Sequence, residues 1–296
     1  MNHRLTDLKA LRLKAMDIRQ DIMTSLAAAK SGHSAGPLGM ADIFTALFFN
    51  VAKIDPTNPS WPERDRIVLS NGHICPVLYA TMAQAGFFPK EELMTLRQLG
   101  TRLQGHPHRS ALPGLETTSG PLGSGTSQSA GMALAFKMDG TSQRVWCLTS
   151  DGEQQEGNTW EGVMFAAAKQ LDNLTVIMDR NYIQIDGTTE TIMPLDPLAD
   201  KYRAFNWHVI EIDGHNMEAI IDALEEAKSM HHRPTLILAN VVPGKGVSYM
   251  ENNYIWHGAP PGIGDVPGAP SKADQLPVAL ADLAKMRQQI ETDHMT

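Results

Sequence analysis

The sequence predicts an α/β protein with a doubly wound, mostly parallel sheet that carries helices on both faces. Short apolar runs rich in strand formers alternate with longer stretches of helical periodicity, most clearly beyond residue 145. Continuous apolar runs of this kind are typical of parallel strands that are buried on both faces. Several runs end in glycine and polar residues, and ligands bind at the carboxyl ends of such strands. The predicted strands are residues 67–69, 145–149, 174–179, 208–212 and 235–241.

Helical periodicity begins near the N-terminus, where apolar residues recur at steps of three and four between residues 5 and 30. Residues 31–39, which contain three glycines and a proline, are expected to form a tight loop. A Pro/Gly-rich linker at residues 262–270 precedes an amphipathic, marginal helix. We therefore expect one domain over residues 1–270 and a helical tail over residues 271–296. Further helices are predicted at residues 40–50, 76–85, 90–99, 126–137, 159–170, 197–205 and 217–230.

Composition excludes several classes of protein. The chain has 296 residues, of which 42% are apolar and 20% charged, so a substantial core can form. The net charge of −8 argues against a nucleic acid or an acidic membrane as partner. The charged N-terminus is unlike a signal peptide, and the longest apolar run, residues 43–52, is too short to span a bilayer. Cys75 and Cys147 suggest neither a disulfide framework nor a zinc site, so a cytoplasmic protein is expected.

Two of the predicted strand ends carry hard oxygen ligands. Asp151 follows the apolar run 145–148, and Asn181 follows the run 174–178. Their separation of thirty residues is about the length of one βαβ unit. Carboxylate, amide and backbone carbonyl oxygens suit Mg²⁺ or Ca²⁺, and a helix beginning near Gly157 favours a phosphate. Asp-Gly alone is more often a capping turn, but the two loops together predict a metal–diphosphate site.

The motifs around these strand ends resemble those of a known family. Asp151-Gly152, a spacer and Asn181 resemble the metal–diphosphate motif of thiamine diphosphate enzymes, and DGEQQEGNTWE (151–161) is similar to transketolases. The segments SGHSAGPLG (31–39), RDRIVLSNGH (64–73) and WHGAP (256–260) are also similar to transketolase segments.

In two places the sequence departs from the family pattern. Ser150 replaces the usual Gly, which we expect to crowd the turn slightly. Arg180 stands where Asn or Asp is common, and we expect it to bring a new contact near the diphosphate.

The resemblance implies the thiamine diphosphate-binding fold, with thiamine diphosphate and Mg²⁺ as cofactors and Ca²⁺ or Mn²⁺ as substitutes for the metal. It assigns catalytic roles to His33, His73, His106, His257 and Glu156. It assigns cofactor binding to His73, Gly120, Leu122, Gly152, Glu156, Asn181 and His257. The implied metal ligands are Asp151, Asn181 and the backbone carbonyl of Ile183. His108 has no counterpart in the family and is expected at the surface.

The activity that the resemblance implies is transfer of a two-carbon ketol unit from a ketose phosphate to an aldose or aldose phosphate. No residue matches the activating glutamate of the family's pyrimidine-binding domain. The chain is therefore expected to be the N-terminal subunit of a two-subunit transketolase. It would be active with a C-terminal subunit that carries this domain, in a heterotetramer.

Two alternatives to this function remain. One is the α subunit of a 2-oxo acid dehydrogenase, whose pattern lacks the SNGH and WHGAP histidines. The other is a non-catalytic relative that binds the cofactor.

Overall fold

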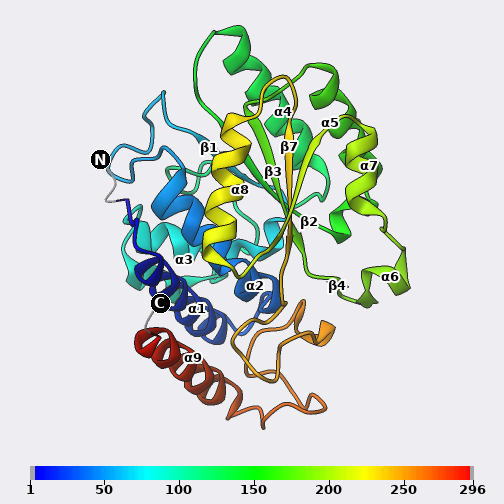
Figure 1. Ribbon diagram of the computed structural model, residues 1–296. Coiled ribbons are helices and arrows are strands. Elements are labelled where there is room, and N and C mark those ends of the chain that lie inside the picture. The colour runs from blue at the N-terminus through cyan, green and yellow to red at the C-terminus, as the bar shows by residue number, and fades with distance from the viewer. Residues whose placement is uncertain (1–3, 294–296) are drawn as a thin grey trace.

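The computed structural model describes residues 4–293, and its centre is a sheet of five parallel strands (Figure 1). The order across the sheet is β1-β2-β3-β7-β6, and every neighbouring pair in it is parallel. The predicted parallel α/β architecture is confirmed. The strands are β1 (Arg66–Leu69), β2 (Val145–Ser150), β3 (Leu174–Arg180), β7 (Thr235–Asn240) and β6 (His208–Asp213).

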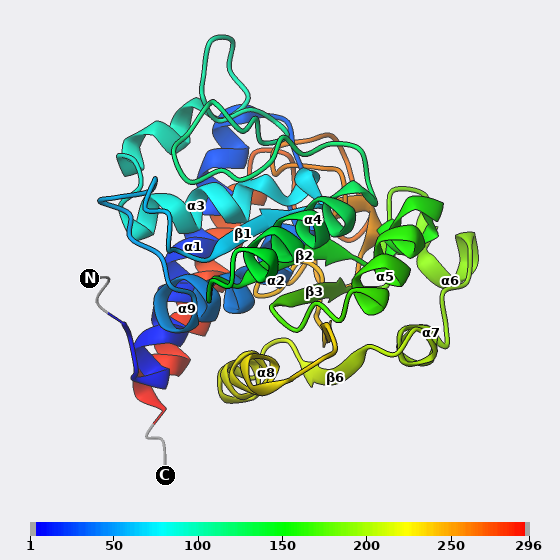
Figure 2. The ribbon, with the colours of Figure 1, turned by 90° about the horizontal axis from the view of Figure 1, so that it is seen from above.

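Helices cover both faces of the sheet, as Figure 2 shows from above. On one face, buried residues of α1, α2, α3 and α8 join one hydrophobic cluster. On the other face, α4, α5 and α7 contribute to a second cluster. The first group is α1 (Leu8–Ala29), α2 (Ala35–Ala46), α3 (Cys75–Ala85) and α8 (Met217–Ser229). The second group is α4 (Ser124–Met138), α5 (Gly157–Ala168) and α7 (Leu198–Ala204).

Strand β2 shows why its sequence is apolar without alternation. Trp146 and Leu148 belong to the cluster beneath α1 and α2, whereas Val145 and Cys147 belong to the cluster beneath α4 and α5. Successive side chains of a strand point to opposite faces, so both sets are removed from water. Each large apolar side chain buried in this way stabilises the fold by about 1.5–3 kcal/mol.

Two predicted elements differ from the structure. Helix α2 begins at Ala35, so most of the expected loop 31–39 is helical. Pro37 is tolerated there because the first turn of a helix leaves its N–H groups unpaired. Gly36 allows close packing, since a Cβ at this position would lie 2.7 Å from Ile74 Cγ2. The helix predicted over residues 90–99 is a 3₁₀ helix of six residues, Lys90–Thr95.

The terminal helix α9 (Gln275–Thr292) lies beside α1 in both views (Figures 1 and 2). Its residues Ala279 and Leu283 are buried in the same cluster as α1. Arg287 Nη1 also donates to Asp17 Oδ1 across 2.7 Å. The segment expected as a marginal tail is thus packed against the first helix, although residues 294–296 of the predicted tail lie outside the described range. No helix within residues 4–293 has the length and apolar character needed to cross a bilayer.

A buried chain of charged groups joins three elements on the face that carries α1. Arg19 of α1 donates two hydrogen bonds to the Asp42 carboxylate of α2, across 2.6 and 3.0 Å. Asp42 also faces His215 Nδ1 at 2.8 Å, and His215 Nε2 accepts the Val242 N–H at 2.8 Å. Since Val242 follows β7, this chain fixes the start of the segment that leads to His257.

We predict that Asp42→Ala lowers the free energy of unfolding by about 3–5 kcal/mol, because Arg19 would remain buried without its counter-charge. Urea unfolding measures the change. The control is Asp200→Ala, which removes one of the two carboxylate partners of the exposed Arg203 and is expected to cost less than about 1 kcal/mol. Equal losses in the two variants would contradict the prediction.

Candidate active site

The carboxyl ends of β1, β2 and β3 lie side by side at one edge of the sheet. Their register places Ser150 beside Asp179, and the Ser70 N–H donates to Leu148 O across 2.8 Å. The loops after these strands and the segment after β7 enclose a cavity of about 250 Å³. Its lining includes seven residues predicted from the sequence: His73, Leu122, Asp151, Gly152, Glu156, Ile183 and His257.

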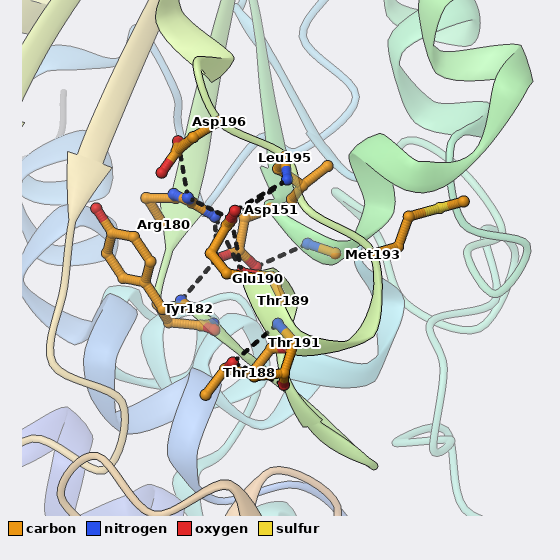
Figure 3. A network of polar contacts seen from close by, with 12 residues as sticks. Asp151, Arg180, Tyr182, Thr188, Thr189, Glu190, Thr191, Met193, Leu195 and Asp196 are labelled. Carbon is orange, nitrogen blue, oxygen red and sulfur yellow. Dashed lines mark hydrogen bonds and ion pairs between the residues drawn. The ribbon is translucent and has the colours of Figure 1, made fainter.

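The side chains of Asp151 and Asn181 are held by backbone N–H groups at adjacent strand ends. Asp151 is only 1% exposed. Its Oδ1 accepts the Gly152 N–H at 2.7 Å and its Oδ2 accepts the Tyr182 N–H at 2.7 Å (Figure 3). Tyr182 has a left-handed backbone with φ 64°. Asn181 Oδ1 in turn accepts the Ile183 N–H at 3.0 Å. The Asp151 carboxylate thus reaches the backbone of the residue that follows Asn181.

The electrostatics of these strand ends fit a cation. Burial raises the pKa of Asp151 to about 6, and the Tyr182 N–H and the Arg180 guanidinium offset part of that rise. Burial and the nearby Asp151 charge raise the pKa of Asp179 well above its usual range. Neither Asp179 oxygen has a hydrogen-bond partner among the described residues. Two buried carboxyl groups this close are costly when both are ionised, so either protonation or a cation must relieve the repulsion. Their oxygens are donors that suit Mg²⁺ or Ca²⁺.

The metal ligand set cannot consist of acidic and imidazole side chains alone. Within residues 4–293, no group of three or more His, Cys, Asp or Glu side chains could hold a metal ion. An ion at Asp151 would be completed by other oxygen donors, such as amide or backbone carbonyl groups and oxygens of a ligand. Mg²⁺ is commonly bound in this way, by one or two carboxylates together with substrate phosphates.

Orphaned polar atoms and open glycine surfaces also fit a polar cofactor. Among the described residues, His33 Nδ1, His257 Nδ1 and Gln184 Oε1 are buried without hydrogen-bond partners. Buried polar groups normally have partners, so these atoms fit hydrogen bonds to a polar ligand or to ordered water. Gly120 has φ 155°, and no described atom lies within 4 Å of the Cβ position that another residue would occupy. A ligand could therefore approach the Gly120 backbone closely.

Three of the four predicted histidines form one cluster. The ring centroids of His33 and His73 are 5.0 Å apart, and His257 lies 5.3 Å from His73 and 5.6 Å from His33. His106 is exposed and lies beside this cluster. Its Cδ2 is 3.2 Å from the position that a Cβ on Gly72, the residue before His73, would occupy. His108 is exposed, as predicted.

Burial keeps the clustered imidazoles neutral. It lowers the pKa of His33 to about 3, with smaller contributions from His257, Arg97 and His106. Burial also lowers the pKa of His257 to about 4 and that of His73 well below its usual range. A neutral imidazole carries one donor and one acceptor nitrogen, so each of these rings can exchange a proton with a bound hydroxyl.

Glu153 is a site residue that the sequence analysis missed. This buried carboxylate accepts the Gly123 N–H at 2.6 Å and the Ser150 N–H at 3.2 Å, and it also accepts the Ser70 hydroxyl. It therefore ties the loops after β1 and β2 to the glycine-rich segment before α4. In the sequence, only its position two residues after Asp151 indicated that Glu153 belongs to the site.

Arg97 was also missed. It lies close enough to contribute to the lowered pKa values of His33 and His106, and its backbone is left-handed with φ 59°. A non-glycine residue held in this region is uncommon. No local pattern indicated that Arg97 would lie near these histidines, because residues 90–99 resembled an ordinary helix.

The two departures from the family pattern occupy adjacent strand ends. Ser150 is the last residue of β2 and its N–H donates to Glu153, and its effect on the turn stays a prediction. Arg180 is only 1% exposed and makes an ion pair with Asp151, Nη1 to Oδ2, at 3.4 Å (Figure 3). A new contact next to a predicted metal ligand is therefore present.

Comparisons with known proteins decide the family. The family described as transketolase, thiamine diphosphate binding domain, matches residues 8–275. This chain belongs to that family. The chain is 45% identical over 247 residues to the 6-deoxy-6-sulfo-D-fructose transketolase subunit SqwG of Clostridium sp. (strain MSTE9), covering 83% of this chain and 90% of the relative. It is 36% identical to an apulose-4-phosphate transketolase subunit of Phocaeicola vulgatus, covering 97% of this chain and 98% of the relative.

A solved structure supports the same assignment. The crystal structure of transketolase from Campylobacter jejuni matches with a TM-score of 0.82 and 30% identity. The match covers 97% of this chain and 48% of the solved chain, so this chain spans about half of that transketolase. The predicted thiamine diphosphate-binding fold is confirmed, and so is the prediction of a transketolase subunit. These relatives lend no support to the 2-oxo acid dehydrogenase alternative or to a non-catalytic one.

The lowered pKa values predict how stability depends on pH. When the pH falls below about 6.5, histidines of the unfolded chain bind protons, whereas the pKa of His257, at about 4, keeps it neutral in the fold. His257 therefore reduces the free energy of unfolding between pH 6.5 and pH 4. We predict that His257→Asn reduces the loss of stability between pH 7 and pH 5 by about 2 kcal/mol, measured by urea unfolding. The exposed His108→Asn serves as control, and an equal change in both variants would contradict the prediction.

Proposed function

We propose that this chain is the diphosphate-binding subunit of a two-subunit transketolase that moves a two-carbon ketol unit from a ketose phosphate, or a similar anionic ketose, to an aldose or aldose phosphate. The observation that carries the proposal is the cavity in which the His73 and His257 imidazoles face the Asp151 strand end. Acidic oxygen ligands suit a metal–diphosphate group, and neutral imidazoles suit proton transfer to sugar hydroxyls.

Mg²⁺ would be held by Asp151, Asn181 and the Ile183 carbonyl. The burial of Asp151 and the orphaned oxygens of Asp179 support a cation here. Ca²⁺ or Mn²⁺ would substitute, since both accept oxygen ligands. Thiamine diphosphate, when bound, supplies the stabilisation of a carbanion that ketol transfer requires. Its contacts in this chain would be His73, Gly120, Leu122, Gly152, Glu156, Asn181 and His257.

The histidines would handle the protons of the sugar. His33 and His257 would hydrogen-bond the donor carbonyl and hydroxyls, and His73 would lie between the diphosphate and donor C1. His106, at the exposed edge of the cluster, would contact the C1 hydroxyl. Because the clustered rings are neutral, each can accept a proton from a hydroxyl without first losing one of its own.

The partner would be a C-terminal subunit with the pyrimidine-binding domain, which supplies the activating glutamate. The relatives named as subunits, matched over nearly their full lengths, support a divided enzyme. Glu156 is exposed at the start of α5, and the same helix exposes Met164 and Phe165. These residues suit a protein interface, and we propose a heterotetramer in which Glu156 lies between paired sites. The free cysteines Cys75 and Cys147 suit the cytoplasm.

The donor sugar is open to a direct assay. The names of two relatives give 6-deoxy-6-sulfo-D-fructose and apulose 4-phosphate as their substrates. Both carry an anionic group away from the ketol end. We therefore propose a ketose donor with an anionic terminus, and the assay should include xylulose 5-phosphate, apulose 4-phosphate and 6-deoxy-6-sulfofructose, each with an aldose phosphate acceptor.

We predict ketol transfer only when this chain is mixed with a C-terminal transketolase subunit that carries the pyrimidine-binding domain, in the presence of thiamine diphosphate and Mg²⁺. The reason is that this chain has no counterpart of the activating glutamate. Product formation is followed by mass spectrometry for the two proteins separately and for their mixture. Activity of this chain alone would overturn the divided-enzyme proposal.

We further predict that Asp151→Ala abolishes Mg²⁺-dependent binding of thiamine diphosphate by the assembled enzyme, because it removes the only carboxylate of the proposed ligand set. Isothermal titration calorimetry measures the affinity. Asp186→Ala, which removes an exposed carboxylate from the neighbouring hairpin, should leave the affinity within about twofold. Undiminished binding by Asp151→Ala would refute the metal assignment.

A further inference from the structure

Arg180 is the most heavily bonded side chain near the proposed metal ligands. Its guanidinium donates to Glu190 Oε1 at 2.9 Å, to Asp196 Oδ1 at 3.0 Å and to Thr189 Oγ1 at 3.1 Å. It also pairs with Asp151 Oδ2 at the longer distance of 3.4 Å. Figure 3 shows these groups converging on one guanidinium. Arg180 therefore links Asp151 to a segment that it contacts at both ends.

That segment comprises residues 189–196, which include α6 (Thr189–Ile192). Glu190 near its start also accepts the Leu195 N–H at 3.2 Å, so Arg180 and Glu190 close the segment into a loop. Few other polar contacts hold it to the metal site, the clearest being Gln155 Nε2 to Met193 O at 2.9 Å. In Figure 1, α6 lies at the end of the sheet where the strands terminate, away from the main body.

We infer that Arg180 is a positioning residue with two separable effects, which rest on the proposed metal site at Asp151. The planar fork of its guanidinium holds residues 189–196 in place. Its positive charge, shared among Asp151, Glu190 and Asp196, sets the electrostatic environment of the metal ligand. Arginine suits both roles, because it is always charged and offers several donors in a fixed plane.

The two effects predict different responses to substitution. Removing the charge with Arg180→Met leaves three carboxylates with less compensation, so a divalent cation should bind more tightly. Glu190→Gln does the reverse, because Arg180 keeps its charge and loses one negative partner, so the cation should bind more weakly. Arg180→Lys keeps the charge but lacks the planar fork. It should leave cation affinity near that of the wild type while loosening residues 189–196.

The test measures Mn²⁺ affinity and hydrogen exchange on the full-length protein. Free Mn²⁺ is titrated by electron paramagnetic resonance in the presence of thiamine diphosphate, and exchange is followed for peptides spanning residues 187–197. We expect Arg180→Met to bind Mn²⁺ at least about threefold more tightly and Glu190→Gln at least about threefold more weakly. Exchange of the peptides should accelerate about tenfold in Arg180→Met and Arg180→Lys.

The matched control is Arg203→Met. Arg203 is an exposed arginine of α7 whose guanidinium pairs with two carboxylates, Asp200 and Glu211, and it makes no contact with Asp151 among the described residues. It should change neither readout. A merely structural role for Arg180 would lower Mn²⁺ affinity in both Arg180→Met and Glu190→Gln, and that result would overturn the inference.

The failure of the inference can be distinguished from failure of the proposed metal site. Asp151→Ala is titrated with Mn²⁺ in the same series. If it retains the affinity of the wild type, Asp151 is not the metal ligand and the proposed function loses its metal assignment. If it loses Mn²⁺ while the Arg180 and Glu190 variants shift in the same direction, only the inference about Arg180 is wrong.

Discussion

The burial of the Asp151 carboxylate at the end of a central strand is the constraint on which the site depends. Strand β2 is covered on both faces, so its last residues leave the sheet in a region with little water. A carboxylate there is stable only with donors and positive charge around it. The chain provides two backbone N–H groups and the Arg180 guanidinium. The carboxylate oxygens of Asp151, and those of Asp179, which have no hydrogen-bond partner within residues 4–293, are the groups that suit a divalent cation.

Burial shifts the pKa values of the clustered histidines in the opposite direction to that of Asp151. The same exclusion of water that raises the pKa of Asp151 lowers the pKa of His33, His73 and His257. Burial therefore favours the neutral form of the Asp151 carboxyl group and of the three imidazoles. A nearby cation would favour the ionised form of the carboxylate, while the buried imidazoles stay neutral, each with one nitrogen that donates and one that accepts a hydrogen bond. In the proposed function, the strand ends separate a metal-binding side from a proton-transferring side within one cavity.

The loops that form this cavity are held together by a few buried polar groups. Glu153 connects the loops after β1 and β2 to the start of α4. Asp42 and His215 fix the start of the segment that leads to His257. Such networks position side chains on neighbouring strand ends, where a shift of about 1 Å would matter for catalysis. They come from parts of the sequence that show no chemical motif of their own.

The sequence by itself determined the parallel α/β class, most strand boundaries and the cluster of motifs that resembles transketolases. It could do so because buried strands need apolar residues on both faces and because Asp151, Asn181 and the histidines sit in characteristic local strings. Tertiary structure decided the rest. The helical start of α2 depends on Gly36 packing against Ile74, and the packing of α9 depends on α1. The roles of Glu153 and Arg180 depend on groups brought near them by the fold, such as Ser70 and Asp196, and no local pattern records those contacts.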